Sequence, residues 1–251
     1  MTLSGPWLAG VDGCRSGWIA AFVRPTGQKV QTRLFAHFAD ILSAVEAPAI
    51  IAVDAPIGLP DHSYGGRRAD NIVRQLLLAR KSSVFPVPSR SAVFADQGRY
   101  MDSESRRRAH QRICTVAAAT STPPRRISIF TFGILEKIRD VDVVLRDHSS
   151  ARKRVHETHP EFEFQQLNGE KAVAEAKKSE AGLHLRTRLL MRGGLSPEAV
   201  NGPAPKGAKP DDLLDALACA LVARRIYANE AHPFPDPPDR DGFDLPMAIW
   251  R

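Results

Sequence analysis

The chain has 251 residues, of which 43% are hydrophobic and 25% charged, and this composition excludes bulk disorder. No run of 18 apolar residues is present, so we expect no membrane span. The first residues lack the basic and apolar regions of a secretory signal. Three scattered cysteines are too few for a disulfide framework. Together these features predict a protein in a reduced, cytoplasmic setting.

The charge is concentrated in one part of the chain. The net charge is +7 overall, but residues 66–126 hold 13 basic and 4 acidic residues, a local net charge of +9. A basic block of this kind favours a polyanionic partner, most simply nucleic acid, and a solvated arginine-rich surface is the alternative. The candidate nucleic-acid-binding residues are Arg67, Arg68, Arg74, Arg90, Arg106, Arg107 and Arg108.

The first half of the chain predicts a β-meander followed by a crossover. Residues 7–13, 17–24 and 28–36 are separated by turns rich in Gly and Pro, which favours three antiparallel strands. Residues 38–48 have helical spacing, and residues 49–56 form the apolar run typical of a strand buried on both faces. This order of elements is typical of an α/β fold.

The second half of the chain is predicted to be mostly helical. The predicted helices lie near residues 72–81, 103–120, 127–147, 162–167, 172–191 and 211–229. A short strand is predicted at residues 154–158, and the proline-rich tail, about residues 231–251, is predicted to be irregular. We therefore expect one domain over residues 1–251, with a basic insertion at about 60–126.

Acidic residues stand at the ends of three predicted strands. Asp12, Asp54 and Glu157 each close an apolar run, and ligands gather outside the carboxyl ends of strands in an open α/β sheet. Asp212 and Asp215 are three residues apart near the start of the last helix, so they share a face. The alternatives are a turn-forming role for the strand-end aspartates, a helix-capping role for Asp211 or Asp212, and a helix-dipole role for Asp215.

Converging carboxylates repel one another and are costly to bury unpaired. Mg²⁺ or Mn²⁺ would compensate for this, because hard cations prefer oxygen ligands. Two such ions can activate water and stabilise a leaving oxygen at a phosphodiester. The predicted catalytic residues are Asp12, Asp54, Glu157, Asp212 and Asp215, and the four aspartates are the predicted metal ligands.

Several long motifs occur in a fixed order: GVDGCRSGW, AVDAPIGLP, RRADNIVR, SSVFPVPSR, ETHPEFEFQQLNG and DDLLDALACALVA. This pattern resembles the bacterial domain-of-unknown-function family 429, whose members are described as predicted RNase H-like nucleases. The resemblance implies an α/β fold with an RNase H-like mixed five-stranded sheet flanked by helices. It also implies helical insertions after the fourth strand and a C-terminal helix that closes the site.

The segment DLLDALA, at residues 212–218, is similar to the last helix of Holliday junction resolvases, which share the RNase H-like superfamily. The similarity implies that Asp12 and Asp54 are strand-borne ligands and that Asp212 and Asp215 are helix-borne ligands. Resolvases usually carry Glu where this chain has Asp54. Glu157 belongs to the family's own motif.

The function predicted from the sequence is metal-dependent hydrolysis of nucleic-acid phosphodiesters by a two-metal-ion, RNase H-like mechanism. A non-catalytic module that binds nucleic acid or a small molecule is the alternative, and an ATP-dependent phosphotransferase of the actin and sugar-kinase type is a weaker one. Nucleic acid of unspecified type is the expected partner, with a homodimer as an open option and no membrane. The roles of His156 and His159 stay open.

Overall fold

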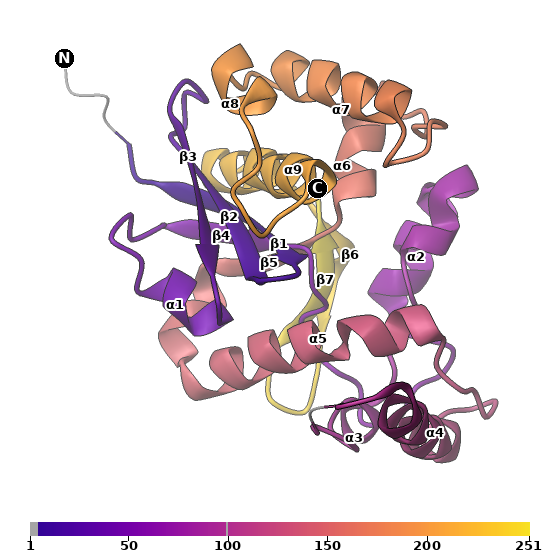
Figure 1. Cartoon of the computed structure of the whole chain (residues 1–251). Coiled ribbons are helices and arrows are strands. Elements are labelled where there is room, and N and C mark those ends of the chain that lie inside the picture. Colours follow the sequence, from indigo (N-terminus) through magenta and orange to yellow (C-terminus); the bar gives the residue numbers. More distant parts are fainter. Residues whose placement is uncertain (1–4, 99) are drawn as a thin grey trace.

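The computed structural model describes residues 5–98 and 100–251 (Figure 1). Within these residues one mixed sheet of seven strands has the order β3-β2-β1-β4-β5-β7-β6. The strands are β1 (Leu8–Cys14), β2 (Gly17–Val23), β3 (Val30–Phe35), β4 (Ile50–Val53), β5 (Val155–Thr158), β6 (Pro233–Arg240) and β7 (Pro246–Trp250).

The first three strands form the predicted antiparallel meander, and the following strands add to it in parallel. β1 pairs with β2 and β2 with β3 in antiparallel ladders, whereas β1–β4, β4–β5 and β5–β7 are parallel pairs. The α/β class and the mixed sheet flanked by helices are therefore confirmed. The carboxyl ends of β1, β4 and β5 lie at one edge of the sheet, because these strands are parallel neighbours.

The expected count of five strands is wrong, because the proline-rich tail forms the hairpin β6–β7. β6 is the edge strand of the sheet, where a missing backbone N–H leaves no neighbour unpaired. The ladder between β6 and β7 is interrupted between Phe234 and Asp239, and Pro235, Pro237 and Pro238 fall within this interruption. Prolines thus mark an irregular edge strand here rather than an irregular tail.

Helices cover both faces of the sheet and form the insertion. The α-helices are α1 (Phe38–Leu42), α2 (Arg68–Leu76), α3 (Arg90–Val93), α4 (Ser103–Ala119), α5 (Ile129–Asp147), α6 (Pro160–Leu167), α7 (Glu180–Arg192), α8 (Pro197–Asn201) and α9 (Pro210–Ala228). Two 3₁₀ helices are η1 (Leu78–Ser83) and η2 (Ser149–Lys153). The helix predicted at 172–191 begins only at Glu180, and the segment from Gly169 to Ser179, which connects α6 to α7, is not helical.

Two apolar layers hold the sheet between helices. One layer joins α9 and α7 to one face, and the other joins α1 and α5 to the opposite face. Figure 1 shows α9 and α5 on the two sides of the sheet, with α2 above the right-hand end of α5 and α3 and α4 below it. None of the helices in the described residues is long and apolar enough to cross a membrane.

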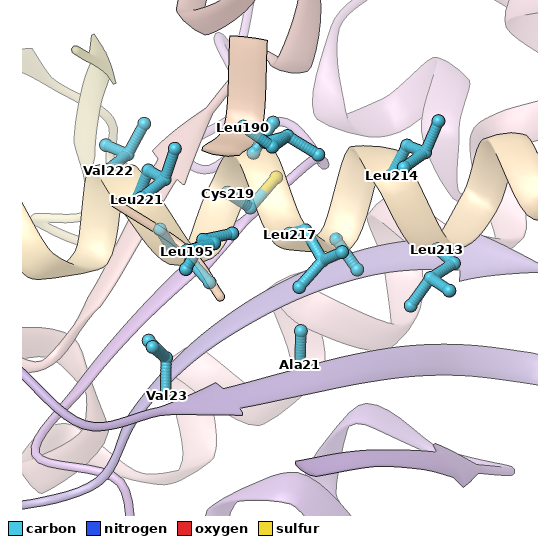
Figure 2. Close-up of a cluster of buried hydrophobic side chains, with 14 of the residues drawn as sticks. Ala21, Val23, Leu190, Leu195, Leu213, Leu214, Leu217, Cys219, Leu221 and Val222 are labelled. Carbon is cyan, nitrogen blue, oxygen red and sulfur yellow. The ribbon is translucent and has the colours of Figure 1, made fainter. Parts of the chain in front are cut away.

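Helix α9 packs on β1 at unusually short range. A Cβ atom on Gly10 would lie 2.1 Å from the carbonyl oxygen of Ala216 and 2.0 Å from the backbone nitrogen of Ala220. Leu217 of α9 faces Ala21 and Val23 of β2 (Figure 2). Small residues at this contact let the helix and the strand approach closely, and this packing fixes the start of α9 against the edge where β1 ends.

Candidate active site

The strand-end acids meet where the parallel strands end. Val11 of β1 lies beside Val53 of β4, and Asp12 and Asp54 follow these two residues directly. Glu157 of β5 is the register partner of Val53. A cavity of about 290 Å³ opens at this edge and is lined by Asp12, Asp54 and Glu157. The structure therefore brings together the three acids that the sequence placed at the ends of separate strands.

Asp12 is the buried acid at the centre of this edge. Its side chain accepts a hydrogen bond from the backbone N–H of Gly13 at 2.8 Å, which fixes one oxygen. Burial raises the pKa of Asp12 well above its usual range, and the negative charges of Asp215 and Asp54 raise it further. The pKa of Asp54 is raised as well. Burial raises it by more than the charges of His159 and Lys177 lower it.

Asp215 joins the strand-end acids from helix α9. It is 2% exposed, and burial raises its pKa to about 7 although the nearby Lys177 lowers it. One of its oxygens, Oδ2, forms an ion pair with the ammonium of Lys177. The other, Oδ1, is buried and has no hydrogen-bond partner in the described part of the chain. This oxygen therefore lacks the donor that a buried carboxylate oxygen usually has.

Asp212 has a structural task as well as a place near the site. Its Oδ2 accepts a hydrogen bond from the backbone N–H of Lys209 at 2.9 Å, at the start of α9. Neither Asp211 nor Asp212 is the N-cap, which is Lys209; Asp212 is the third residue of α9, and its side chain accepts from the backbone N–H of the N-cap residue. Its charge still contributes to raising the pKa of Asp12, although less than burial, Asp215 and Asp54 do.

Glu157 differs from the other acids because an arginine pairs with both oxygens of its carboxylate. Arg67 donates to both of its oxygens, at 2.6 Å and 2.8 Å, and the backbone N–H of Ile57 donates at 2.7 Å. Arg67 also donates to Asp70 of α2. Burial raises the pKa of Glu157 while Arg67 lowers it. We therefore assign Glu157 a positioning role, in which it ties β5 to the start of α2 beside the cavity.

The two histidines near Glu157 have different surroundings. His156 packs edge-on against Trp250 with ring centroids 5.0 Å apart, and burial lowers its pKa to about 4. It is therefore a neutral core residue at neutral pH. His159 caps α6, since its Nδ1 accepts a hydrogen bond from the backbone N–H of Glu161 at 3.2 Å, and its ring lines the cavity.

Sequence reasoning missed Lys177, which lies in the non-helical segment between α6 and α7. Burial alone would lower its pKa, but the charges of Asp215 and Asp12 outweigh burial and raise it. The side-chain ammonium of Lys177 thus places a positive charge among the aspartates. The sequence does not single out Lys177, because the site was recognised by its acidic residues and a lone lysine in a connecting segment belongs to no such pattern.

The carboxylate oxygens are of the type that a hard divalent cation prefers, but the side chains are not placed around a common point. Asp12, Asp54 and Asp215 offer carboxylate oxygens, including the orphaned Oδ1 of Asp215. Among residues 5–98 and 100–251, however, no three His, Cys, Asp or Glu side chains are placed as a ready metal site. At the same place, the ammonium of Lys177 forms an ion pair with one oxygen of Asp215.

A sequence profile for proteins of unknown function, DUF429, matches residues 10–240. The chain belongs to the DUF429 family. The match includes the ends of β1, β4 and β5 and all of α9, so the whole carboxylate cluster lies within the family region of the chain. No curated protein and no solved structure matches the chain significantly.

Three arginines of the basic block in this DUF429 protein serve its own structure. Arg67 is 3% exposed and is held by Glu157 and Asp70, so it does not present a free cation to a ligand. Arg90 forms ion pairs with Asp142 and Asp241. Arg74 donates to the backbone carbonyls of Lys81 and Val84.

The remaining candidate arginines lie nearer the surface of the DUF429 protein. Arg68 is 3.6 Å from Asp239, and Arg108 pairs with Glu104 on the same helix. The guanidinium of Arg106 lies over the ring of Phe132, 5.1 Å from its centroid. Arg107 is exposed. Contact of these four residues with phosphate stays a prediction.

Proposed function

We propose that this DUF429 protein hydrolyses phosphodiester bonds of nucleic acid with the help of divalent cations, on an RNase H-like fold. One observation carries the proposal: Asp12 and Asp54 follow register partners of two parallel strands and line one cavity, and the charge of Asp215 on α9 is near enough to raise the pKa of Asp12. The strand order β3-β2-β1-β4-β5, with an antiparallel meander followed by parallel strands, supports the fold assignment. Carboxylates that repel one another in a poorly solvated place lower the stability of the fold, and a bound cation would offset this repulsion.

Three aspartates would hold the cations, and their neighbours would prepare the substrate. Mg²⁺ or Mn²⁺ bound there supplies a more acidic water and charge stabilisation at the leaving oxygen. Asp12, Asp54 and Asp215 provide the oxygens, with Asp212 at the start of the same helix. Lys137 lines the cavity next to Gly13, and its ammonium, now 4.8 Å from the ring centroid of Trp18, would contact a phosphate oxygen.

Release of Lys177 from Asp215 is part of the same proposal. The lysine lies on a non-helical connection between α6 and α7, and its side chain is 37% exposed. It can therefore turn towards solvent without unfolding a helix. The ammonium offsets part of the negative charge of the aspartates in the absence of a cation, and a divalent cation would replace it.

A nuclease assay tests the proposal. Wild-type protein is incubated with labelled RNA, DNA, hybrid and branched substrates in Mn²⁺, in Mg²⁺ and in EDTA. We expect cleavage of at least one substrate with metal, and a loss of about 100-fold or more in Asp12→Asn and Asp215→Asn, because each change removes a charged ligand. Glu230→Gln, an exposed acid beyond the end of α9, is the matched control and should retain activity.

A second function, binding without catalysis, is favoured by the ion pair between Lys177 and Asp215. A permanent ammonium would make divalent cations unnecessary and leave the cavity as a recognition site. In that case no substrate of the panel is cleaved with either metal, while nucleic acid still binds.

A further inference from the structure

A second cavity, of about 650 Å³, lies next to the carboxylate site and has no part in the proposed chemistry. It is bounded by Arg74 of α2, Ala117 of α4 and Phe130 of α5. Phe85 lines both this cavity and the carboxylate cavity, so the two are neighbours. The volume falls in the range that ligand-binding clefts occupy.

Two aromatic rings give this second cavity a flat apolar surface. The rings of Phe85 and Phe130 are nearly parallel, with an angle of 7° between their planes and 6.2 Å between their centroids. Phe130 is 70% exposed, which is unusual for an aromatic side chain that has a parallel partner. An exposed aromatic face stacks readily on a nucleobase, whatever the base, since every base has a π-face.

The charge around these rings is positive. Arg125 and Arg126 line the cavity, are exposed, and have no hydrogen bond or ion pair from their guanidinium groups within the described residues. Arg74 adds a third guanidinium, held in place by the carbonyls of Lys81 and Val84. None of the described residues that line the cavity is Asp or Glu. The cavity is therefore complementary to a ligand that joins an aromatic ring to an anion.

We propose that this cavity binds an unpaired nucleotide of a single-stranded nucleic acid, next to the phosphodiester held at the carboxylate site. The base stacks on the exposed ring of Phe130, which lies parallel to the ring of Phe85, and Arg125 and Arg126 contact its phosphate. The assignment to a strand being cleaved rests on the proposed function. Single strands are favoured over duplexes, because a base inside a duplex is stacked on its neighbours and presents only its edges.

Fluorescence anisotropy in EDTA tests this proposal without any cleavage. The labelled ligands are a single-stranded DNA, an RNA of the same sequence, a blunt duplex, and a DNA strand with abasic sugars at its central positions. We expect the single strands to bind at least about 5-fold more tightly than the duplex and the abasic strand, because stacking is lost in both. The tighter of the two single strands identifies the sugar that the cavity prefers.

Matched variants assign the binding to the cavity. Phe130→Ala should weaken single-strand binding about 5-fold or more, whereas Phe130→Trp should retain it because the aromatic face remains. Tyr227→Ala, which removes an exposed aromatic ring on α9, should bind like wild type. Arg125→Ser combined with Arg126→Ser should flatten the dependence of affinity on salt, and the exposed pair Arg188→Ser and Arg192→Ser on α7 should not.

The outcomes separate this proposal from the nuclease proposal. If Phe130→Ala binds the single strand more weakly than wild type, and wild type binds the abasic strand more weakly than the intact one, the nucleotide site stands. If wild type then cleaves nothing, the nuclease proposal alone fails. If the abasic strand or the duplex binds as tightly as the single strands, the nucleotide site is wrong, whatever the cleavage assay gives. Equal affinities of Phe130→Ala and Tyr227→Ala would likewise overturn it.

Discussion

The surroundings of single titratable residues distinguish the candidate site from the core that supports it. Burial favours the neutral form of both Asp215 and His156, so it raises the pKa of the first and lowers the pKa of the second. The pKa of Asp215 rises to about 7 next to an ammonium and an orphaned oxygen, and the pKa of His156 falls to about 4 against Trp250. The first residue has charged neighbours, whereas the second faces an aromatic ring and is part of the packing.

His156 gives a pH-dependent prediction. Its folded pKa lies below its unfolded pKa, so the unfolded chain binds more protons between pH 6.5 and 4 and stability falls as the pH drops through this window. Between pH 7.5 and pH 5, wild type should lose about 2 kcal/mol more unfolding free energy than His156→Phe, which cannot be protonated. Urea unfolding at both pH values measures this, and equal losses in the two proteins would contradict the assignment.

At the scale of elements, the close contact between β1 and α9 positions the acids. Asp12 is on β1 and Asp215 is on α9, and Gly10 lies between the two elements with no room for a Cβ atom. The sequence predicts both elements, since the strand is apolar and the helix has acids at its start and arginines near its end. It does not predict their distance, because the fit of Gly10 against Ala216 and Ala220 is a tertiary contact between residues more than 200 positions apart.

Gly10→Ala tests this contact. The added methyl group would overlap the backbone of α9, so we expect a loss of about 3 kcal/mol in unfolding free energy. The control is Gly133→Ala in α5, where a Cβ atom meets nothing within 4 Å. That change should stabilise the protein by about 0.5–1 kcal/mol, as for a glycine in a helix interior. Similar effects of the two substitutions in urea unfolding would rule out a special role for the Gly10 contact.

Elsewhere, element prediction failed for specific physical reasons. The prolines of β6 suggested an irregular tail, but an edge strand tolerates them where its ladder is interrupted. Residues 172–179 were predicted as helix, yet Lys177 there reaches Asp215 instead, and α7 begins only after its cap at Ser179. In both places tertiary contacts outweigh local pattern.

Across the whole molecule, the insertion is joined to the sheet through buried ion pairs. Arg90 at the start of α3 links Asp142 of α5 and Asp241 of the β6–β7 hairpin, and Arg67 links Glu157 of β5 to Asp70 of α2. Composition alone assigned these arginines to a nucleic-acid surface, because charge counts do not reveal which cations find buried partners. The strand-end acids were predictable from the parallel topology, whereas Lys177 and the aromatic cavity needed the folded structure.

Calorimetric titration of the protein with Mn²⁺ tests the central claim, that Asp12, Asp54 and Asp215 form a cation site now held by Lys177. Wild type should bind Mn²⁺ at millimolar concentrations or below, Asp12→Asn should lose this binding, and Lys177→Gln should bind more tightly because the competing ammonium is gone. Glu230→Gln should titrate like wild type. Absence of binding in both wild type and Lys177→Gln, or binding that Asp12→Asn leaves unchanged, would contradict the claim.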